Sequence, residues 1–246
     1  MNDALTRDDF LGGQVQLLQP KTGYRAGVDP VLLAASVPAV PGQSILDLGC
    51  GVGAAALCLG ARVSGLSLTG VELQQDYARL AERNGGGALE VVVADLNDLP
   101  LDLRDRQFDH VIANPPYFDR TAGRAADDAG RETALGENTP LLIWVKVAAK
   151  RVKPKGFVHF IHRAERLPEI LAALPQHMGS IEVLPISPRI GRRAELVIIR
   201  ARKNGRAAFK LHAPLILHEG PRHLQDADSY VPLVKSVLRE GAALRF

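Results

Sequence analysis

The tetrapeptide NPPY begins at Asn114 and directly follows the apolar run FDHVIA. The simplest interpretation is a rigid turn after a strand, because a residue before proline favours extended geometry. The same residues can also hold an amino group. The Asn114 side-chain oxygen and the Pro115 carbonyl can accept two N–H hydrogen bonds. Pro116 fixes the path of the chain, and Tyr117 offers a face on which a flat ring can stack. Such a site would act through orientation and charge stabilisation, without a strong base.

Acidic residues end three earlier apolar runs. Asp47 opens the pattern DLGCG, Glu72 ends SLTGVE, and Asp95 ends LEVVVAD. Each residue alone is as easily a helix cap or a solvated strand end. Together they follow three consecutive predicted strands, at the edge where open α/β sheets bind ligands. There Asp47 can meet an ammonium group, Glu72 two ribose hydroxyls, and Asp95 an adenine amino group. The glycine pattern alone does not choose a cofactor, because dinucleotide sites use a similar one.

Alternating strands and helices position these residues. The pattern predicts helices over 29–37, 74–84, 140–152 and 166–174, and a helix after the glycine turn; strands are predicted over 44–49, 67–73, 89–96, 108–114, 156–162, 181–187 and 195–202. This alternation favours a parallel sheet with helices on both faces. The last two strands are joined too closely for a crossover helix, so they should form an antiparallel hairpin. The predicted α/β fold is Rossmann-like, with a seven-stranded, mostly parallel sheet and an antiparallel final hairpin strand, and it resembles class I methyltransferases.

The order of these motifs resembles the methyltransferases that act on adenine N6 and on glutamine N5. The segment FLGGQVQLLQPKTGYRAGVDPVLLAASV and the stretch RETA after NPPY are similar to the bacterial tRNA1(Val) adenine-37 N6-methyltransferase family. The resemblance covers roughly residues 10–205, and the tail matches the family pattern only loosely. It implies methyl transfer from S-adenosylmethionine to adenine N6 in RNA, with tRNA as the favoured substrate.

The resemblance also implies roles for individual residues. The residues expected at the cofactor are Asp47, Gly49, Gly51, Glu72, Leu73, Asp95, Leu96 and Asn114. The residues expected at the reacting base are Asn114, Pro115, Pro116 and Tyr117. A segment before the first strand should close over the cofactor, with Tyr24, Arg25 and Asp29 as candidates. For Asp29, a helix N-cap is the favoured interpretation.

Positive charge is concentrated in one stretch. Residues 141–210 hold 15 lysines and arginines against 4 acidic residues, which gives this stretch a charge of +11. The rest of the chain carries −8, so the net charge of the whole chain is +3. The excess suits a nucleic acid or, equally, a solvated surface. The polar segment 119–139 is expected to be a lid over substrate RNA. The arginines considered for phosphate contact are Arg124, Arg131, Arg189, Arg192 and Arg193.

Composition sets the remaining expectations. Three regions are expected: an N-terminal extension with a cofactor-covering helix (1–43), a methyltransferase core (44–205) and a C-terminal tail (206–246). No apolar run reaches 18 residues, no signal-peptide pattern is visible, and the two cysteines form no framework, so we expect a cytoplasmic protein without a membrane span. No His or Cys spacing predicts a metal. Structural roles are expected for four residues: Trp144 in the core, Cys50 behind the cofactor, and His159 and His162 with satisfied rings.

Three other functions fit parts of the pattern. Protein glutamine N5-methylation shares NPPY, but an N-terminal helical domain is expected there, and only 43 residues precede the first predicted strand. DNA adenine N6-methylation is the second, although no target-recognition domain is visible. A non-catalytic RNA-binding module is the third, and the intact NPPY argues against it. The oligomeric state is not predicted.

Overall fold

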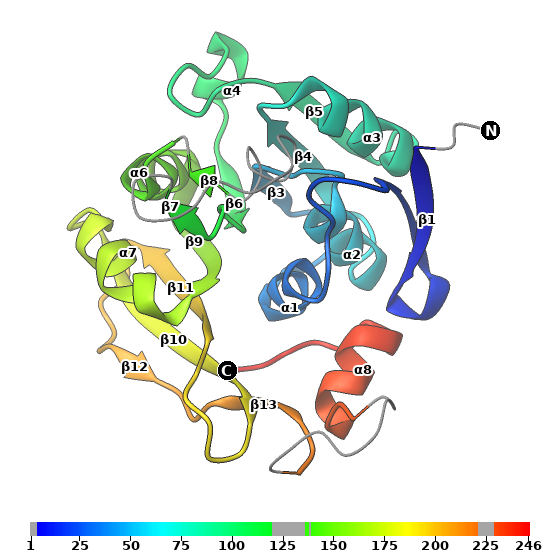
Figure 1. The fold of residues 1–246 in the computed structure, drawn as a ribbon. Helices are drawn as coiled ribbons and strands as arrows, with labels where there is room; N and C mark the ends of the chain where they lie inside the picture. The colour runs from blue at the N-terminus through cyan, green and yellow to red at the C-terminus, as the bar shows by residue number, and fades with distance from the viewer. Residues whose placement is uncertain (1–3, 120–135, 138, 221–228) are drawn as a thin grey trace.

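The computed structural model describes residues 4–119, 136–137, 139–220 and 229–246, and the fold is drawn in Figure 1. Seven strands form the body of its central sheet, in the order β10-β11-β9-β6-β3-β4-β5. Their bounds are β3 Ser44–Leu48, β4 Ser67–Glu72, β5 Leu89–Val93, β6 Phe108–Ala113, β9 Val152–Arg163, β10 Met178–Arg189 and β11 Leu196–Lys203. Two short strands, β12 (Lys210–Leu211) and β13 (Leu215–His218), pair with β10 at the sheet's edge.

Strand direction follows the predicted pattern. Strands β3, β4, β5, β6 and β9 are parallel neighbours, and β11 runs antiparallel to both β9 and β10. The predicted final hairpin is therefore confirmed. All five parallel strands end at one edge of the sheet, and the turn between β10 and β11 lies at the same edge, because Leu196 pairs with Arg163 at the end of β9.

Helices cover both faces of the sheet (Figure 1). One face packs α1 (Asp29–Ser36), α2 (Ala54–Arg62), α3 (Gln75–Gly85) and α8 (Pro232–Glu240); the other packs α4 (Leu101–Asp105), α6 (Leu141–Arg151) and α7 (Leu167–Ala173). The strands supply both layers by alternation, since Ile45 joins the first cluster and Leu46 the second. Within the described residues, no helix is both long and apolar enough to cross a membrane.

The N-terminal segment holds a hairpin that the sequence analysis did not predict. Strands β1 (Leu5–Phe10) and β2 (Val15–Pro20) are antiparallel, joined by the short helix η1 (Leu11–Gly13). Leu11 and Leu17 are buried in the same cluster as α1, α2 and α8. The remaining short elements are η2 (Ala164–Arg166) and the parallel pair β7 (Phe118–Asp119) and β8 (Gly136–Glu137).

Candidate active site

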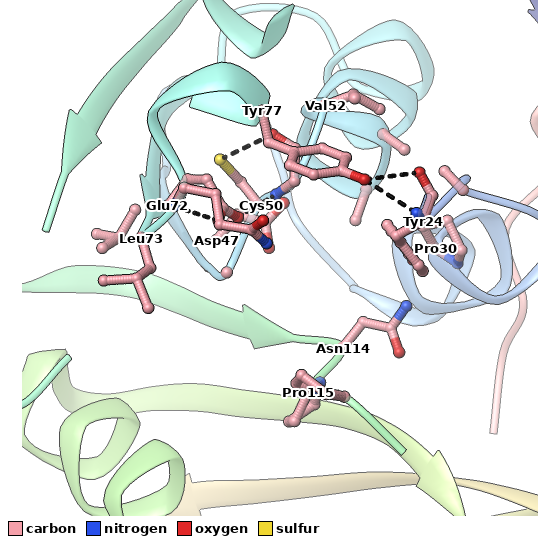
Figure 2. A pocket seen from close by; sticks show the side chains of 18 of the residues that line it. Tyr24, Pro30, Asp47, Cys50, Val52, Glu72, Leu73, Tyr77, Asn114 and Pro115 are labelled. Atoms are coloured by element: carbon pink, nitrogen blue, oxygen red, sulfur yellow. Dashed lines mark hydrogen bonds between the residues drawn. The ribbon is translucent and has the colours of Figure 1, made fainter. Parts of the chain in front are cut away.

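A cavity lies at the edge of the sheet where the parallel strands end, and Figure 2 shows it from close by. It gathers every residue predicted for the cofactor and for the base: Asp47, Gly49, Gly51, Glu72, Leu73, Asp95, Leu96, Asn114, Pro115, Pro116 and Tyr117. Tyr24 and Asp29 from the segment before β3 also line it. Arg25, Arg189, Arg192 and Arg193 do not, while Arg124 and Arg131 lie outside the described residues, as does most of the predicted lid.

The glycine turn after β3 is shaped by backbone conformation and by one aromatic neighbour. Gly49 has φ +63°, which favours glycine, and a Cβ built on it would lie 2.4 Å from the Trp144 ring. Trp144 comes from α6 and donates its indole N–H to the Thr139 carbonyl at 3.2 Å. The core prediction for Trp144 was incomplete, because the ring is buried and also lines the cavity.

Two buried carboxylates face the cavity from β3 and β4. Asp47 is 2% exposed and accepts a hydrogen bond from the Ala56 N–H in α2 at 3.3 Å. Burial raises its pKa to about 8, with a further contribution from the charge of Glu72. Glu72 accepts N–H bonds from Gly51 (2.9 Å) and Gln74 (2.8 Å), and burial raises its pKa also. Both groups therefore favour a ligand that brings a positive charge or hydroxyl donors.

Asp95 differs from these two carboxylates. Strand β5 ends at Val93, two residues earlier than the acid, so the predicted strand was too long. Asp95 is exposed and accepts hydrogen bonds from the backbone N–H and the side-chain amide of Asn97, at 2.8 and 3.0 Å. Its carboxylate lies at the rim of the cavity next to the buried Leu96.

Tyr24, from the segment before β3, lines one side of the cavity and is held there by Tyr77 of α3. The Tyr77 hydroxyl of α3 accepts from the Tyr24 N–H at 2.9 Å and donates to the Tyr24 carbonyl at 3.2 Å, as the dashed lines of Figure 2 show. Arg25 instead forms an ion pair with Asp8 at 2.6 Å. Asp29 is not the helix N-cap: Val28 occupies that position, so the favoured prediction for Asp29 was wrong. Its carboxylate accepts a hydrogen bond from the Tyr117 hydroxyl at 2.5 Å.

The NPPY motif follows β6 with its amide facing the cavity (Figure 2). The Asn114 Oδ1 atom is buried and has no hydrogen-bond partner among the described residues. A buried acceptor without a donor is uncommon in folded proteins and costs about 1–3 kcal/mol. Pro115 is buried behind it, and Tyr117 is held by Asp29. The oxygen that the sequence assigned to an amino group therefore has an unused hydrogen-bonding capacity within the described structure.

The two histidines of β9 are buried, and the prediction of satisfied rings was wrong for His159. His159 contacts His110 at 3.1 Å through Nε2, but its Nδ1 has no hydrogen bond within the described part of the chain. His162 Nδ1 accepts the Arg163 N–H at 2.9 Å, and the ring also interacts with the backbone of Pro116. The cysteines Cys50 and Cys58 are buried free thiols, and Cys50 lines the cavity as expected. No cluster suited to a metal occurs in the ranges described.

The basic stretch 141–210 does not form one face. We call Lys153, Lys155, Arg202 and Lys203 the far-edge cluster, because β9 begins and β11 ends there, opposite the cavity. Much of its charge is engaged, as in the 2.8 Å ion pair of Lys153 with Asp109. Arg189, at the cavity edge, donates to the carbonyls of residues 219 and 220 and to Ser229 Oγ. The Arg189 guanidinium is therefore engaged within the chain, while Arg192 and Arg193 are exposed in the turn.

Comparison with known proteins agrees with this geometry. A family model described as a methyltransferase domain matches residues 45–131. A tRNA1(Val) (adenine(37)-N6)-methyltransferase of Haemophilus influenzae is 30% identical over 158 residues, which is 62% of this chain and 67% of the relative. The corresponding protein of Glaesserella parasuis is 24% identical over 217 residues, covering 85% and 89%. A solved structure, a predicted O-methyltransferase from Agrobacterium tumefaciens, superposes with a TM-score of 0.73 at 28% identity and covers 89% of this chain and 99% of that one. The chain is an S-adenosylmethionine-dependent methyltransferase of class I fold, and it belongs to the tRNA1(Val) (adenine(37)-N6)-methyltransferase family.

Proposed function

We propose that this enzyme transfers a methyl group from S-adenosylmethionine to the exocyclic N6 amino group of adenine in tRNA. The buried Asn114 Oδ1 atom, with no partner in the described structure, is the observation that carries the proposal. An oxygen held in this way at a cavity needs an N–H donor from a ligand. A planar amino group has two N–H donors, and Asn114 and the Pro115 carbonyl give it two acceptors.

The residues around the cavity fit the parts of the cofactor. Asp47, with its raised pKa, becomes favourable as a carboxylate when an ammonium group lies beside it. Glu72 keeps lone pairs for ribose hydroxyls beyond its two backbone bonds. Asp95 and Leu96 would hold the adenine, and Tyr24 and Pro30 also line the cavity. When bound, the cofactor supplies an electrophilic methyl group on a positively charged sulfur.

The chain's role at the substrate is orientation. Adenine N6 shares its lone pair with the ring, so the free base is a poor nucleophile. Acceptors at Asn114 and Pro115 favour a more tetrahedral nitrogen whose lone pair can point at the methyl group. Transfer of the methyl group leaves N6 cationic, and its extra proton passes to solvent water, so no buried base is needed beyond these acceptors. Tyr117 provides the ring on which the extruded base stacks.

The RNA is proposed to extend from the cavity toward the β10–β11 turn. Three strand spacings separate β6 from β10, about 14 Å, a distance that two or more nucleotides of an extended strand can span. The exposed Arg192 and Arg193 are the proposed phosphate contacts in this turn. Relatives named for tRNA methylation support this choice of substrate. A cytoplasmic location is part of the proposal.

Labelled S-adenosylmethionine, offered with separate pools of tRNA, rRNA, DNA and protein, tests the proposal. We expect label in tRNA, recovered as N6-methyladenosine after digestion to nucleosides, and about 100- to 1,000-fold slower labelling with an Asn114→Ala enzyme. Label in glutamine would replace the proposal with protein methylation, and label only in DNA would replace RNA as the substrate. Cofactor binding without transfer to any pool would favour a non-catalytic module.

A further inference from the structure

The tyrosine of the NPPY motif is held by a residue from a distant part of the chain. The Tyr117 hydroxyl donates to Asp29 Oδ2 at 2.5 Å, although 88 residues separate the two in sequence. Asp29 is in the first turn of α1, where Val28 holds the N-cap position, and the hydrogen bond that its carboxylate accepts comes from Tyr117. Both residues line the cavity. The carboxylate is therefore used by the tyrosine and not by its own helix.

A second group restricts the same ring from β9. The His162 and Tyr117 ring centroids are 5.3 Å apart, with an angle of 59° between the planes. His162 is fully buried, and its Nδ1 accepts a backbone N–H, so the neutral ring carries its proton on Nε2. Burial lowers the pKa of His162 to about 4, which keeps the ring neutral at physiological pH. A fixed hydroxyl on one side and a fixed ring on the other leave Tyr117 little freedom to rotate.

We propose that Asp29 is a positioning residue that fixes the Tyr117 ring for the incoming base. The inference rests on the proposed function in one respect, since it takes Tyr117 as the stacking surface. Asp29 lies next to Pro30 and near Tyr24, which line the part of the cavity assigned to the cofactor. Through the hydrogen bond from the Tyr117 hydroxyl to Asp29, the segment before β3 also fixes the position of the ring on which the base would stack. An aromatic ring already in place lowers the cost of ordering it on binding.

Kinetics of matched variants measure this coupling. Asp29→Ala and Tyr117→Phe each remove the hydrogen bond, and we expect each to lower kcat/KM for RNA by on the order of 10- to 100-fold. The double variant should lose no more than the larger single loss, because both remove one interaction. Asp29→Asn keeps an acceptor oxygen and should recover most of the rate. Asp76→Ala is the control, because it removes an exposed acid from the first turn of α3 and should change nothing.

Cofactor affinity separates positioning from direct contact. The Kd for S-adenosylmethionine should be the same in Asp29→Ala, Asp29→Asn and the wild-type enzyme. A weaker Kd in Asp29→Ala that Tyr117→Phe does not share would make Asp29 a cofactor ligand and overturn the inference. Additive losses in the double variant would overturn it as well.

A readout without substrate keeps this inference apart from the proposed function. The chain has 4 tyrosines, so the aromatic NMR spectrum of protein labelled with 13C-tyrosine is simple, and Tyr117→Phe assigns the signal of residue 117. In Asp29→Ala we expect faster ring flipping and a shifted Tyr117 signal, with Asp29→Asn close to wild type. An unchanged Tyr117 signal would refute the positioning role even if tRNA is the substrate. The expected change would support it even if methyl transfer to tRNA were not found.

Discussion

Replacing Asn114 with alanine should separate activity from stability. Truncating a buried polar residue usually destabilises a protein, because its hydrogen bonds are lost. Asn114 Oδ1 has no such bond to lose within the described structure, and leaving it buried costs about 1–3 kcal/mol. The residue as a whole is only partly buried, so truncation removes little packing. We expect the free energy of unfolding of Asn114→Ala to equal that of the wild type or to exceed it by up to about 2 kcal/mol.

For a chain of this size, 1 kcal/mol corresponds to about 2–4 °C in Tm. Differential scanning calorimetry of the cofactor-free enzymes should therefore show an unchanged or higher Tm for Asn114→Ala. Methyl transfer should fall by about 100- to 1,000-fold, the usual loss when one preorganised hydrogen-bonding group is removed from a reacting centre. Methyl transfer should therefore fall without any loss of thermal stability.

Asn84→Ala is the matched control for stability. The Asn84 side chain makes three hydrogen bonds, to the N–H and carbonyl of Leu18 and to the Val52 carbonyl. Its loss should lower the free energy of unfolding by about 1–3 kcal/mol. If Asn114→Ala lost as much stability as Asn84→Ala, the amide would have a structural partner and the reasoning would be refuted. Full methyl transfer by Asn114→Ala would refute its role at the amino group.

Four further predictions concern Asp47, the glycine turn and the RNA. Because burial raises the pKa of Asp47 to about 8, this carboxyl group is protonated in the cofactor-free enzyme at neutral pH. The affinity for S-adenosylmethionine, measured by calorimetry, should therefore rise about 10-fold per pH unit between pH 6 and 7.5. Asp47→Asn should abolish this pH dependence. The same raised pKa means that the free energy of unfolding of the cofactor-free enzyme falls as pH rises from about 4 to 8. The fall should be smaller in Asp47→Asn. Gly49→Ala should lower Tm by several degrees more than Gly42→Ala, since both have positive φ but only Gly49 faces the indole. Replacing Arg192 or Arg193 with alanine should reduce the slope of log affinity for RNA against log salt concentration by about 1 for each residue. If alanine substitutions in the far-edge cluster reduced the slope equally, the proposed path of the RNA would be refuted.

The acidic residues of the site were predictable because strand order is visible in the sequence. Parallel strands joined by helices must end at one edge, so acids at the ends of successive strands gather there. Asp47 and Glu72 were placed correctly for this reason. Asp95 was placed correctly although β5 ends earlier, because the cavity extends over the residues just beyond the strand.

Contacts between distant segments were not predictable in this way. The hairpin β1–β2 places Gln19 inward at a position where alternation predicts an apolar residue, and Gln19 is satisfied by Ala26 and Asp8. Because Gln19 is polar, the alternation of apolar and polar residues that would indicate strand β2 is interrupted in the sequence. The bond between Asp29 and Tyr117 depends on how α1 packs beside the end of β6, and no local pattern encodes it.

Charge was the least reliable guide, and the reason is the topology of the sheet. Strand β9 runs toward the cavity and β11 runs back, so basic residues close together in sequence are carried to opposite edges. The far-edge cluster is partly engaged in structural bonds, as Lys203 is with the carbonyls of Ala149 and Val152. Only the residues at the cavity edge can assist a substrate held by Asn114. The local excess of +11 in the sequence therefore overstates the positive surface that an RNA would meet.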